Sequence, residues 1–271
     1  MIEKLARELI HGAEKVIIFA GAGIGVELGT PVYWTGENNR YGGERSRFGF
    51  TDLEHAHADL WNKKRMEQLM FYSEKWSQML SQNLDGENSP YELLLNFLTK
   101  NNKDYFVVTS NVDTAFARFG FKGDSIYEIH GAYDRVQCLQ VPHHGVFPRL
   151  KPETGFTLCP KCGSHTRPNV LFFNDPFFNS NYNNLQEDAW DDFLENINRD
   201  DPKTVLIEIG AGLTVPNLRN RTKKLNSGLR VPVIRINLHQ TEMGDHEPYD
   251  VSVPIVELPM TASDGLRSIL V

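Results

Sequence analysis

The chain has 271 residues, of which 40% are apolar, and this is enough for one large α/β domain with a smaller satellite. Its formal net charge is −7 and it contains no sustained run of Lys or Arg, which argues against a protein that binds nucleic acid through phosphate contacts. The first residues offer only a five-residue apolar run, Val16 to Ala20, which is too short for a membrane span and unlike a secretory signal. We therefore expect a cytoplasmic protein without a membrane partner.

The hydrophobic pattern predicts a parallel sheet. Residues 2 to 13 place apolar side chains at helical spacing, and Lys15 to Ala20 then reads as a buried strand that runs into glycines. Further short apolar runs lie at Tyr105 to Val108, Ile126 to Ile129, Val205 to Ile209 and Val233 to Ile236. Such runs, separated by helical stretches, are typical of parallel strands covered on both faces. The predicted fold class is α/β, a Rossmann-like open parallel sheet with helices on both faces.

Two stretches interrupt this pattern. Between Gly36 and about Asn101 the chain is polar and aromatic, with helices predicted near Leu53 to Leu80 and Tyr91 to Leu98. From Tyr133 to about Pro168 the apolar runs thin out, while Pro, Gly, His and all three Cys residues gather there. We predict a Rossmann-like domain from residues 1–36, 102–131 and 170–271. A helical insertion, 37–101, and a zinc-ribbon-like insertion, 132–169, would form the small domain.

Two glycine-rich turns each follow a predicted strand. The first is Gly21-Ala22-Gly23-Ile24-Gly25 and the second is Gly210-Ala211-Gly212-Leu213-Thr214. Glycines at such a turn let a pyrophosphate approach backbone N–H groups at a helix start, and two turns indicate one ligand that crosses the switch point of the sheet. The alternative interpretation is a tight strand-to-helix turn that needs small residues for packing.

Polar side chains follow two further strands. Asn111 and Asp113 stand at the end of one strand, where a ribose hydroxyl and a carboxamide could be bound, although both residue types also commonly cap helices. His130 comes at the end of the next strand, beside Gly131, and a neutral imidazole there could take a proton from a ribose hydroxyl. A lone histidine is more often structural, so this role depends on the whole constellation.

The cysteines indicate a metal site. Cys159-Pro-Lys-Cys162-Gly163 is a knuckle of the kind that holds tetrahedral zinc, and Cys138 lies 21 positions before Cys159. Val141 stands where a fourth cysteine would complete the set, so the fourth ligand would be His143 or His144. We take Cys138, His143, Cys159 and Cys162 as the predicted ligand set of a structural zinc. The alternative is a degenerate module that packing alone holds together.

Taken in order, these segments resemble the sirtuin family of NAD-dependent protein deacylases over nearly the whole chain. The resemblance rests on the glycine opening at Gly21 to Pro31, with Ile24 and Glu27 in their usual places, and on Thr109-Ser110-Asn111-Val112-Asp113. It continues through Glu128-Ile-His130-Gly131, the Cys159 knuckle with the following Arg167 to Asp175, the Gly210 turn, and Ile234-Arg-Ile-Asn237. The sequences of these motifs most resemble those of a divergent bacterial subgroup of the family.

The resemblance implies an enzyme that consumes NAD. It implies that His130 is the general base and that Asn111 and Asp113 hold the nicotinamide ribose and carboxamide. The Arg167 to Asp175 segment would pair with an acyl-lysine peptide. The residues implied to line the NAD are Gly21, Ala22, Gly23, Ile24, Glu27, Tyr33, Ser110, Asn111, Asp113, His130, Gly210, Ala211, Gly212, Thr214 and Asn237.

Several positions depart from the family pattern. Pro31-Val32-Tyr33-Trp34 stands where the family has Pro-Asp-Phe-Arg, so an acidic and a basic side chain beside the nicotinamide pocket are replaced. Ser110 replaces Gln, and Asn174-Asp175 replaces Gly-Glu on the expected peptide-pairing strand.

These departures leave alternatives open. The leading prediction is a protein-lysine deacylase that releases nicotinamide and O-acyl-ADP-ribose. An NAD hydrolase or ADP-ribosyltransferase on the same fold is the alternative, and a non-catalytic NAD or ADP-ribose sensing module is the rival from another class. The acyl group, the protein target and the oligomeric state are not predicted from these residues.

Overall fold

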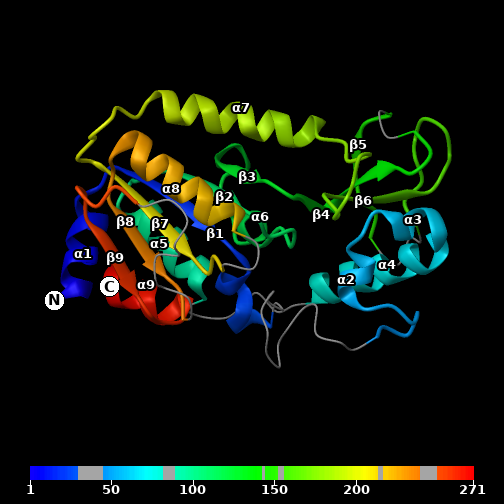
Figure 1. Cartoon of the computed structure of the whole chain (residues 1–271), viewed down its shortest axis with the longest axis horizontal. Helices are drawn as coiled ribbons and strands as arrows, with labels where there is room; N and C mark the ends of the chain where they lie inside the picture. Colours follow the sequence, from blue (N-terminus) through cyan, green and yellow to red (C-terminus); the bar gives the residue numbers. More distant parts are fainter. Residues whose placement is uncertain (30–44, 82–88, 142–143, 152–155, 213–215, 239–248) are drawn as a thin grey trace.

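The structure is a computed structural model that describes residues 1–29, 45–81, 89–141, 144–151, 156–212, 216–238 and 249–271. Its larger part is a six-stranded sheet in the order β3-β2-β1-β7-β8-β9, with every pairing parallel (Figure 1). The strands are β1 (Lys15–Ala20), β2 (Asp104–Thr109), β3 (Ile126–Glu128), β7 (Thr204–Ile209), β8 (Val233–Ile236) and β9 (Ile255–Leu258). The predicted Rossmann-like parallel sheet is confirmed.

Five of the six strands were predicted from their apolar runs, and β9 was not. In β9 the burial alternates, so Val256 and Leu258 are buried while Ile255 and Glu257 are partly exposed. An edge strand of this kind is covered on one face only and therefore lacks the continuous apolar run that marks the central strands.

Helices cover both faces of the sheet (Figure 1). On one face, α1 (Ile2–Gly12), α5 (Pro90–Lys100), α6 (Ala115–Arg118) and α9 (Ala262–Leu270) form one core cluster with side chains such as Ile18 and Val107. On the other face, α7 (Asn181–Glu195) and α8 (Asn217–Leu229) pack on strand residues whose side chains point to that face, such as Phe19 and Phe106, which are next in sequence to Ile18 and Val107. Successive strand residues thus contribute to different cores, as the pleat of a strand requires.

The smaller part contains α2 (Asp52–His55), α3 (Asp59–Lys63), α4 (Arg65–Ser81) and an antiparallel sheet in the order β5-β4-β6. The strands of this sheet are β4 (Gly131–Cys138), β5 (Val146–Pro148) and β6 (Thr166–Val170). After α5, β2 and β3 of the larger part, the chain returns to the smaller part through β4, which begins directly after His130 (Figure 1).

One predicted domain boundary differs from the structure. Helix α5 was assigned to the insertion of residues 37–101, but Tyr91, Leu94 and Phe97 lie in the core cluster of the large sheet. The helix has a strongly apolar face and a Ser89 N-cap that accepts the backbone N–H of Glu92, features that fit a sheet-covering helix as well as an insertion. Sequence periodicity predicted the helix but could not say which core it joins.

The order of the strands places a topological switch between β1 and β7. The chain runs outward from β1 through β2 to β3, and later returns to the other side of β1 with β7, β8 and β9. The two glycine-rich turns follow the neighbouring ends of β1 and β7, where Ala20 pairs with Ile209. Open α/β sheets bind ligands at such a point, beyond the carboxyl ends of the strands.

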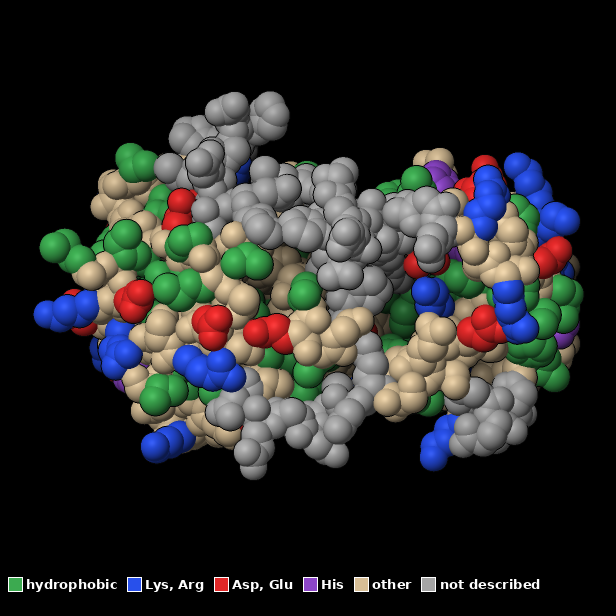
Figure 2. Space-filling model, turned by 90° about the horizontal axis from the view of Figure 1, so that it is seen from below, with side chains coloured by type: hydrophobic (Ala, Val, Ile, Leu, Met, Phe, Trp, Pro, Cys, Tyr) green, Lys and Arg blue, Asp and Glu red, His purple; other side chains and the backbone are tan. Residues whose placement is uncertain are grey.

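On the face shown in Figure 2, basic and acidic side chains are interspersed over the described residues, without a broad basic field. No helix among the described residues is long and apolar enough to cross a membrane. The cytoplasmic location stays a prediction.

Candidate active site and metal centre

The two glycine-rich turns pack directly on each other. The N–H of Gly21 donates to the Ile209 carbonyl at 2.9 Å, and the N–H of Gly23 donates to the Gly210 carbonyl at 3.0 Å. Gly210 has φ +62°, and a Cβ there would lie 2.3 Å from the backbone nitrogen of Ile24. Turn packing therefore explains these glycines, and the first turn begins η1 (Ala22–Leu28) at the switch point.

Asn111 ties the end of β2 to the first turn. Its side-chain amide is buried and donates to the Gly21 carbonyl at 3.2 Å, while its own N–H donates to Thr109 Oγ1 at 3.1 Å. Asp113 accepts the N–H of Ala115 at 3.0 Å and so supports the start of α6. Both predicted binding residues therefore lie at the carboxyl edge. Asp113 supports a helix start, in line with the capping alternative, whereas Asn111 bonds to the first glycine turn and caps no helix.

His130 lies at the same edge and is partly buried. Its Nδ1 is 3.2 Å from the Ser110 carbonyl, and its Nε2 is 3.2 Å from the side-chain amide nitrogen of Asn217. A carbonyl can only accept and an amide NH₂ can only donate, so the ring carries its proton on Nδ1 and presents a lone pair at Nε2. Burial lowers the pKa of His130, and the Ser110 carbonyl and Arg221 act on it in opposite directions, the first raising it and the second lowering it.

The backbone around His130 is fixed from both sides. Gly131 has φ +72°, and a Cβ there would meet the Asn169 carbonyl oxygen at 2.0 Å. The N–H of Leu171 donates to the His130 carbonyl at 2.9 Å. Just before His130, the buried Glu128 carboxylate pairs with Arg135. The imidazole is therefore held on rigid neighbours.

The second glycine turn is held by buried charges beneath it. Arg219 Nε donates to the Ala211 carbonyl at 2.8 Å, and Asn237 Nδ2 donates to the same oxygen at 3.2 Å. Arg219 also lies 3.7 Å from Glu208, which accepts from Arg235 at 2.5 Å. All three charged side chains are almost fully buried.

Some of the other predicted cofactor residues are described by the structure, and others lie outside the described residues. Ile24 is fully buried in the core, and the Glu27 carboxylate accepts the N–H and Oγ of Ser263 at the start of α9, at 3.1 and 2.5 Å. Their cofactor roles, and those of Ala22 and Gly212, stay predictions. Tyr33 and Thr214 lie outside the described residues, as do the other changed positions of Pro31 to Trp34.

Sequence reasoning missed Asn217, Arg219 and Arg221. All three come from the first part of α8, directly after the second glycine turn, where a helix start can face a ligand. Their position after a strand and a turn was the available signal, but no motif distinguished them from surface residues.

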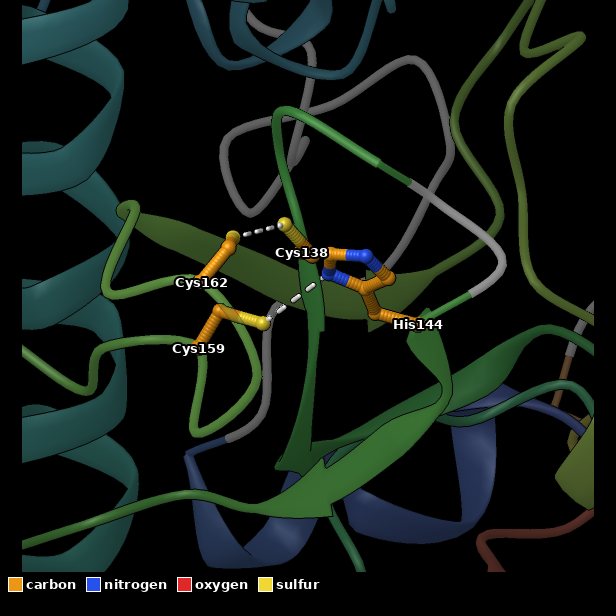
Figure 3. A group of neighbouring side chains, drawn as sticks. All are labelled: Cys138, His144, Cys159 and Cys162. Atoms are coloured by element: carbon orange, nitrogen blue, oxygen red, sulfur yellow. Dashed lines mark hydrogen bonds between the residues drawn. The ribbon is translucent and has the colours of Figure 1, made fainter.

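The three cysteines and one histidine converge in the small part (Figure 3). Cys138 ends β4, and Cys159 and Cys162 come from one turn, in which the N–H of Gly163 donates to the Cys159 carbonyl at 2.8 Å. The histidine is His144; His143, which stood in the predicted ligand set, lies outside the described residues. The ligand atoms of the four side chains all lie within 4.8 Å of one another.

This group fits a tetrahedral zinc ion. Cys138 Sγ is 3.6 Å from Cys162 Sγ, and Cys159 Sγ is 3.5 Å from His144 Nδ1. Zinc–sulfur bonds of ~2.3 Å give tetrahedral edges of about 3.8 Å. The cysteines are free thiols, and hydrogen bonds with Ser164 lower the pKa of Cys162 to about 6, which favours the thiolate that a metal needs.

Together, the fold and these two sites define an α/β protein of the Rossmann-like class with an inserted Cys₃His module. The sequence model of the Sir2 family matches residues 21–215. The chain belongs to the Sir2 family, the family of the sirtuins.

Curated relatives match most of the chain. The sequence is 26% identical to NAD-dependent protein deacetylase 2 of Caldanaerobacter subterraneus subsp. tengcongensis, covering 98% of this chain and 94% of that protein. It is 24% identical to a probable bifunctional ADP-ribose hydrolase/ADP-ribosyltransferase of Fusarium oxysporum f. sp. cubense, covering 91% of this chain but only 44% of that protein. The chain thus spans less than half of the Fusarium protein.

Solved structures share the fold. A mutant Sir2 homologue in complex with ADP-ribose superposes with a TM-score of 0.71 at 20% identity, covering all of this chain and 95% of that one. A Sir2 homologue in complex with NAD has a TM-score of 0.67 at 20% identity, covering 99% and 92%.

Proposed function

We propose that this protein is an NAD-dependent protein-lysine deacylase that releases nicotinamide and O-acyl-ADP-ribose. The observation that carries the proposal is His130, which stands at the carboxyl edge of the sheet, after β3, with Nδ1 protonated and the Nε2 lone pair facing Asn217 at the start of α8. A buried imidazole with a lowered pKa is neutral at pH 7 and can accept a proton.

The carboxyl edge of the sheet fits NAD. The turns after β1 and β7 lead into η1 and α8, so two helix starts face the same edge and supply the partial positive charge that a pyrophosphate requires. Arg221, in the first half of α8, adds a full positive charge that already acts on His130. The Caldanaerobacter relative is named an NAD-dependent protein deacetylase, and one of the similar solved structures is a complex with NAD, which supports the same substrate for this chain.

The residues of the chain have defined tasks in this proposal. Asn111 and Asp113 orient the nicotinamide ribose and carboxamide while the acyl oxygen of the substrate displaces nicotinamide from C1′. His130 Nε2 then takes the proton of a ribose hydroxyl as that oxygen attacks the acyl carbonyl carbon, which the lysine nitrogen afterwards leaves. Asn217, which now donates to Nε2, must yield this position to the hydroxyl. The Ser110 carbonyl accepts from Nδ1 of His130 and so keeps a proton on that nitrogen during the reaction.

ADP-ribosyl transfer to water or to another nucleophile is the second candidate, and one observation favours it. The segment Arg167 to Asp175 was expected to pair with an acyl-lysine peptide, and its part beyond β6 is not a regular strand. Phe173 exchanges backbone bonds with Ala56 and Ala58, and the N–H of Phe172 points to Asp175 Oδ2 at 3.4 Å. Asn174 has φ +54°, so the backbone turns where an extended edge would be needed for β-addition.

The experiment is to incubate the protein with NAD, with and without an acetyl-lysine peptide, and to identify the products by mass spectrometry. His130→Ala is the test variant and His11→Ala, on the remote helix α1, is the matched control. We expect O-acetyl-ADP-ribose only with peptide and only when His130 is present. Free ADP-ribose without peptide would give the second candidate the lead, and NAD binding without nicotinamide release would refute both.

A further inference from the structure

A second group of side chains with the geometry of a nucleophile and its base lies in the small part, apart from His130. The hydroxyl oxygen of Ser46 is 2.8 Å from Nε2 of His55, the last residue of α2. Nδ1 of the same ring is 2.5 Å from Oε1 of Gln68, on α4. A hydroxyl, an imidazole and an amide oxygen thus form one hydrogen-bonded chain, in the order that activated serine and cysteine nucleophiles use.

The proton positions in this chain follow from its far end. The amide nitrogen of Gln68 donates to the His55 carbonyl at 3.0 Å, so the amide oxygen is the end that faces the ring. This oxygen can only accept, and Nδ1 must therefore carry the ring proton. Nε2 is left with a lone pair, and Ser46 must donate its hydroxyl proton to it. The imidazole is therefore in the tautomer of a general base toward this hydroxyl.

The imidazole is held firmly in this position. His55 is fully buried and stacks on the Phe71 ring, with 3.5 Å between the ring centroids. Tyr72 OH donates to the same carbonyl as Gln68, at 2.9 Å, and fixes the backbone at the end of α2. Burial lowers the pKa of His55, against the hydrogen bond with Gln68, which raises it, so the ring is neutral at pH 7. A neutral imidazole on rigid neighbours can accept a proton without first reorganising.

The serine is the end of the chain that meets solvent. Ser46 is partly exposed, whereas its base is fully buried. Its backbone closes a tight turn, because its N–H donates to the Phe50 carbonyl and its carbonyl accepts the N–H of Gly49, both at 2.8 Å. The N–H of Phe48 in this turn points to Ser46 Oγ, 3.3 Å away, and stabilises negative charge that develops on this oxygen.

We propose that Ser46 is an activated nucleophile that accepts acyl groups from activated esters, with His55 as its general base and Gln68 as the residue that positions the base. Ser46 Oγ attacks the carbonyl carbon while its proton moves to His55 Nε2. The bond from that carbon to the leaving oxygen then breaks, and the imidazolium gives its proton to the leaving oxygen. Water cleaves the acyl-serine by the same route, with its proton taken up by Nε2 and returned to Ser46 Oγ.

The hydrogen bonds around Ser46 indicate the class of substrate. The Phe48 N–H stabilises charge on Oγ itself and not on the oxygen of an attacked carbonyl. An activated ester, whose leaving group departs easily, therefore suits this centre better than an amide does. The proposal goes beyond the NAD chemistry and is independent of it, since none of its three residues belongs to the His130 site.

The test uses the whole protein at pH 7 with two probes, an alkyl fluorophosphonate and p-nitrophenyl acetate. The fluorophosphonate reacts irreversibly, since Oγ bonds to phosphorus and fluoride leaves, so mass spectrometry of the protein and its peptides gives the labelled residue and the rate. We expect one label per chain, on Ser46, and release of nitrophenolate above the rate in buffer alone. Ser46→Ala should abolish both, whereas Ser77→Ala, at an exposed position of α4, should change neither.

His55→Gln keeps an acceptor for the Ser46 hydroxyl but cannot take up its proton. It should slow the labelling of Ser46 at least about a hundredfold, the lower end of what a general base contributes. If this variant fails to fold, the labelling rates of Ser46 and Ser77 in the unaltered protein carry the test. The proposal is overturned if Ser46 is labelled no faster than Ser77, or if folded His55→Gln is labelled at the unaltered rate, because the hydrogen bond would then be structural only.

Discussion

The side-chain amide of Asn217 faces Nε2 of His130 across 3.2 Å, at the point where the chain leaves the second glycine turn for α8. The Ser110 carbonyl holds the opposite ring nitrogen at the same distance. One tautomer satisfies both contacts, and the two neighbours come from different strand ends of the sheet. The candidate base is therefore oriented before any substrate arrives, and its lone pair already accepts a hydrogen bond from Asn217.

Replacing this donor by an acceptor of the same shape should change the pH dependence. In Asn217→Asp a carboxylate would face the ring, stabilise the imidazolium and raise the pKa of His130 by about one unit or more. The acidic limb of kcat/KM for nicotinamide release should therefore move to higher pH. Asn220→Asp, exposed on the same helix, serves as the control. An unmoved limb in Asn217→Asp would show that Nε2 is not the group that titrates.

Arg221 should have the opposite influence. Burial first, and then the positive charge of Arg221, lower the pKa of His130, against the Ser110 carbonyl, which raises it. The unaltered protein should thus keep a neutral base below pH 6.5, the ordinary value for histidine. In Arg221→Gln the pKa rises, so activity should be lost earlier as the pH falls. Arg199→Gln, an exposed arginine that is not among the groups acting on the pKa of His130, should leave the profile in place.

The sequence could predict what depends on periodicity and spacing. Apolar runs identified β1, β2, β3, β7 and β8, and the glycines after β1 and β7 identified the switch point. The Cys-x-x-Cys spacing identified the metal module and left two histidines for the fourth position, of which His144 lies with the three cysteines. These patterns involve residues that are close in the sequence, so they can be recognised without knowledge of the fold.

The rest depends on contacts between distant residues. Nothing in the sequence shows that Asn217 lies beside His130, 87 positions away, or that the glycines of the two turns pack on each other. Helix α5 joined the large core because its apolar face meets α9, not because of any feature that distinguishes it from α4. Side-chain partners of this kind are set by tertiary packing, which periodicity does not report.

The close approach of the two turns can be tested with glycine variants. In Gly210→Ala the new Cβ would lie 2.3 Å from the backbone nitrogen of Ile24, at a positive φ, so we expect a loss of about 3 kcal/mol or more in unfolding free energy. Gly29→Ala has a similar φ, +80°, but open space, and should cost only about 1 kcal/mol. Denaturant unfolding measures both. Equal losses would mean that backbone strain, and not the contact with Ile24, requires the glycine.

The metal module should need its ion to fold fully. We expect about one zinc per chain by elemental analysis of protein purified without chelator, and a lower melting temperature after chelation, since structural zinc contributes its binding energy to folding. His144→Ala should lose most of the metal. His165→Ala, in the same module but outside the group of four, should keep it. Full zinc content in His144→Ala would remove this residue from the ligand set.

The last prediction concerns the buried charges under the second glycine turn. Arg235 is fully buried and donates to Glu208 at 2.5 Å and to Glu257 at 2.8 Å. Arg235→Met would leave Glu208 with Arg219 alone, and we expect a loss of about 3–5 kcal/mol in unfolding free energy.

The double variant with Glu208→Gln should recover part of this loss, because the uncompensated carboxylate is then gone. NAD affinity should fall in Arg235→Met as well, because Arg219 would be drawn toward Glu208 and away from the Ala211 carbonyl that it now holds at 2.8 Å. Chemical unfolding of the single and double variants, together with NAD titration by calorimetry, measures both effects. An unchanged NAD affinity would mean that the turn keeps its shape without this network.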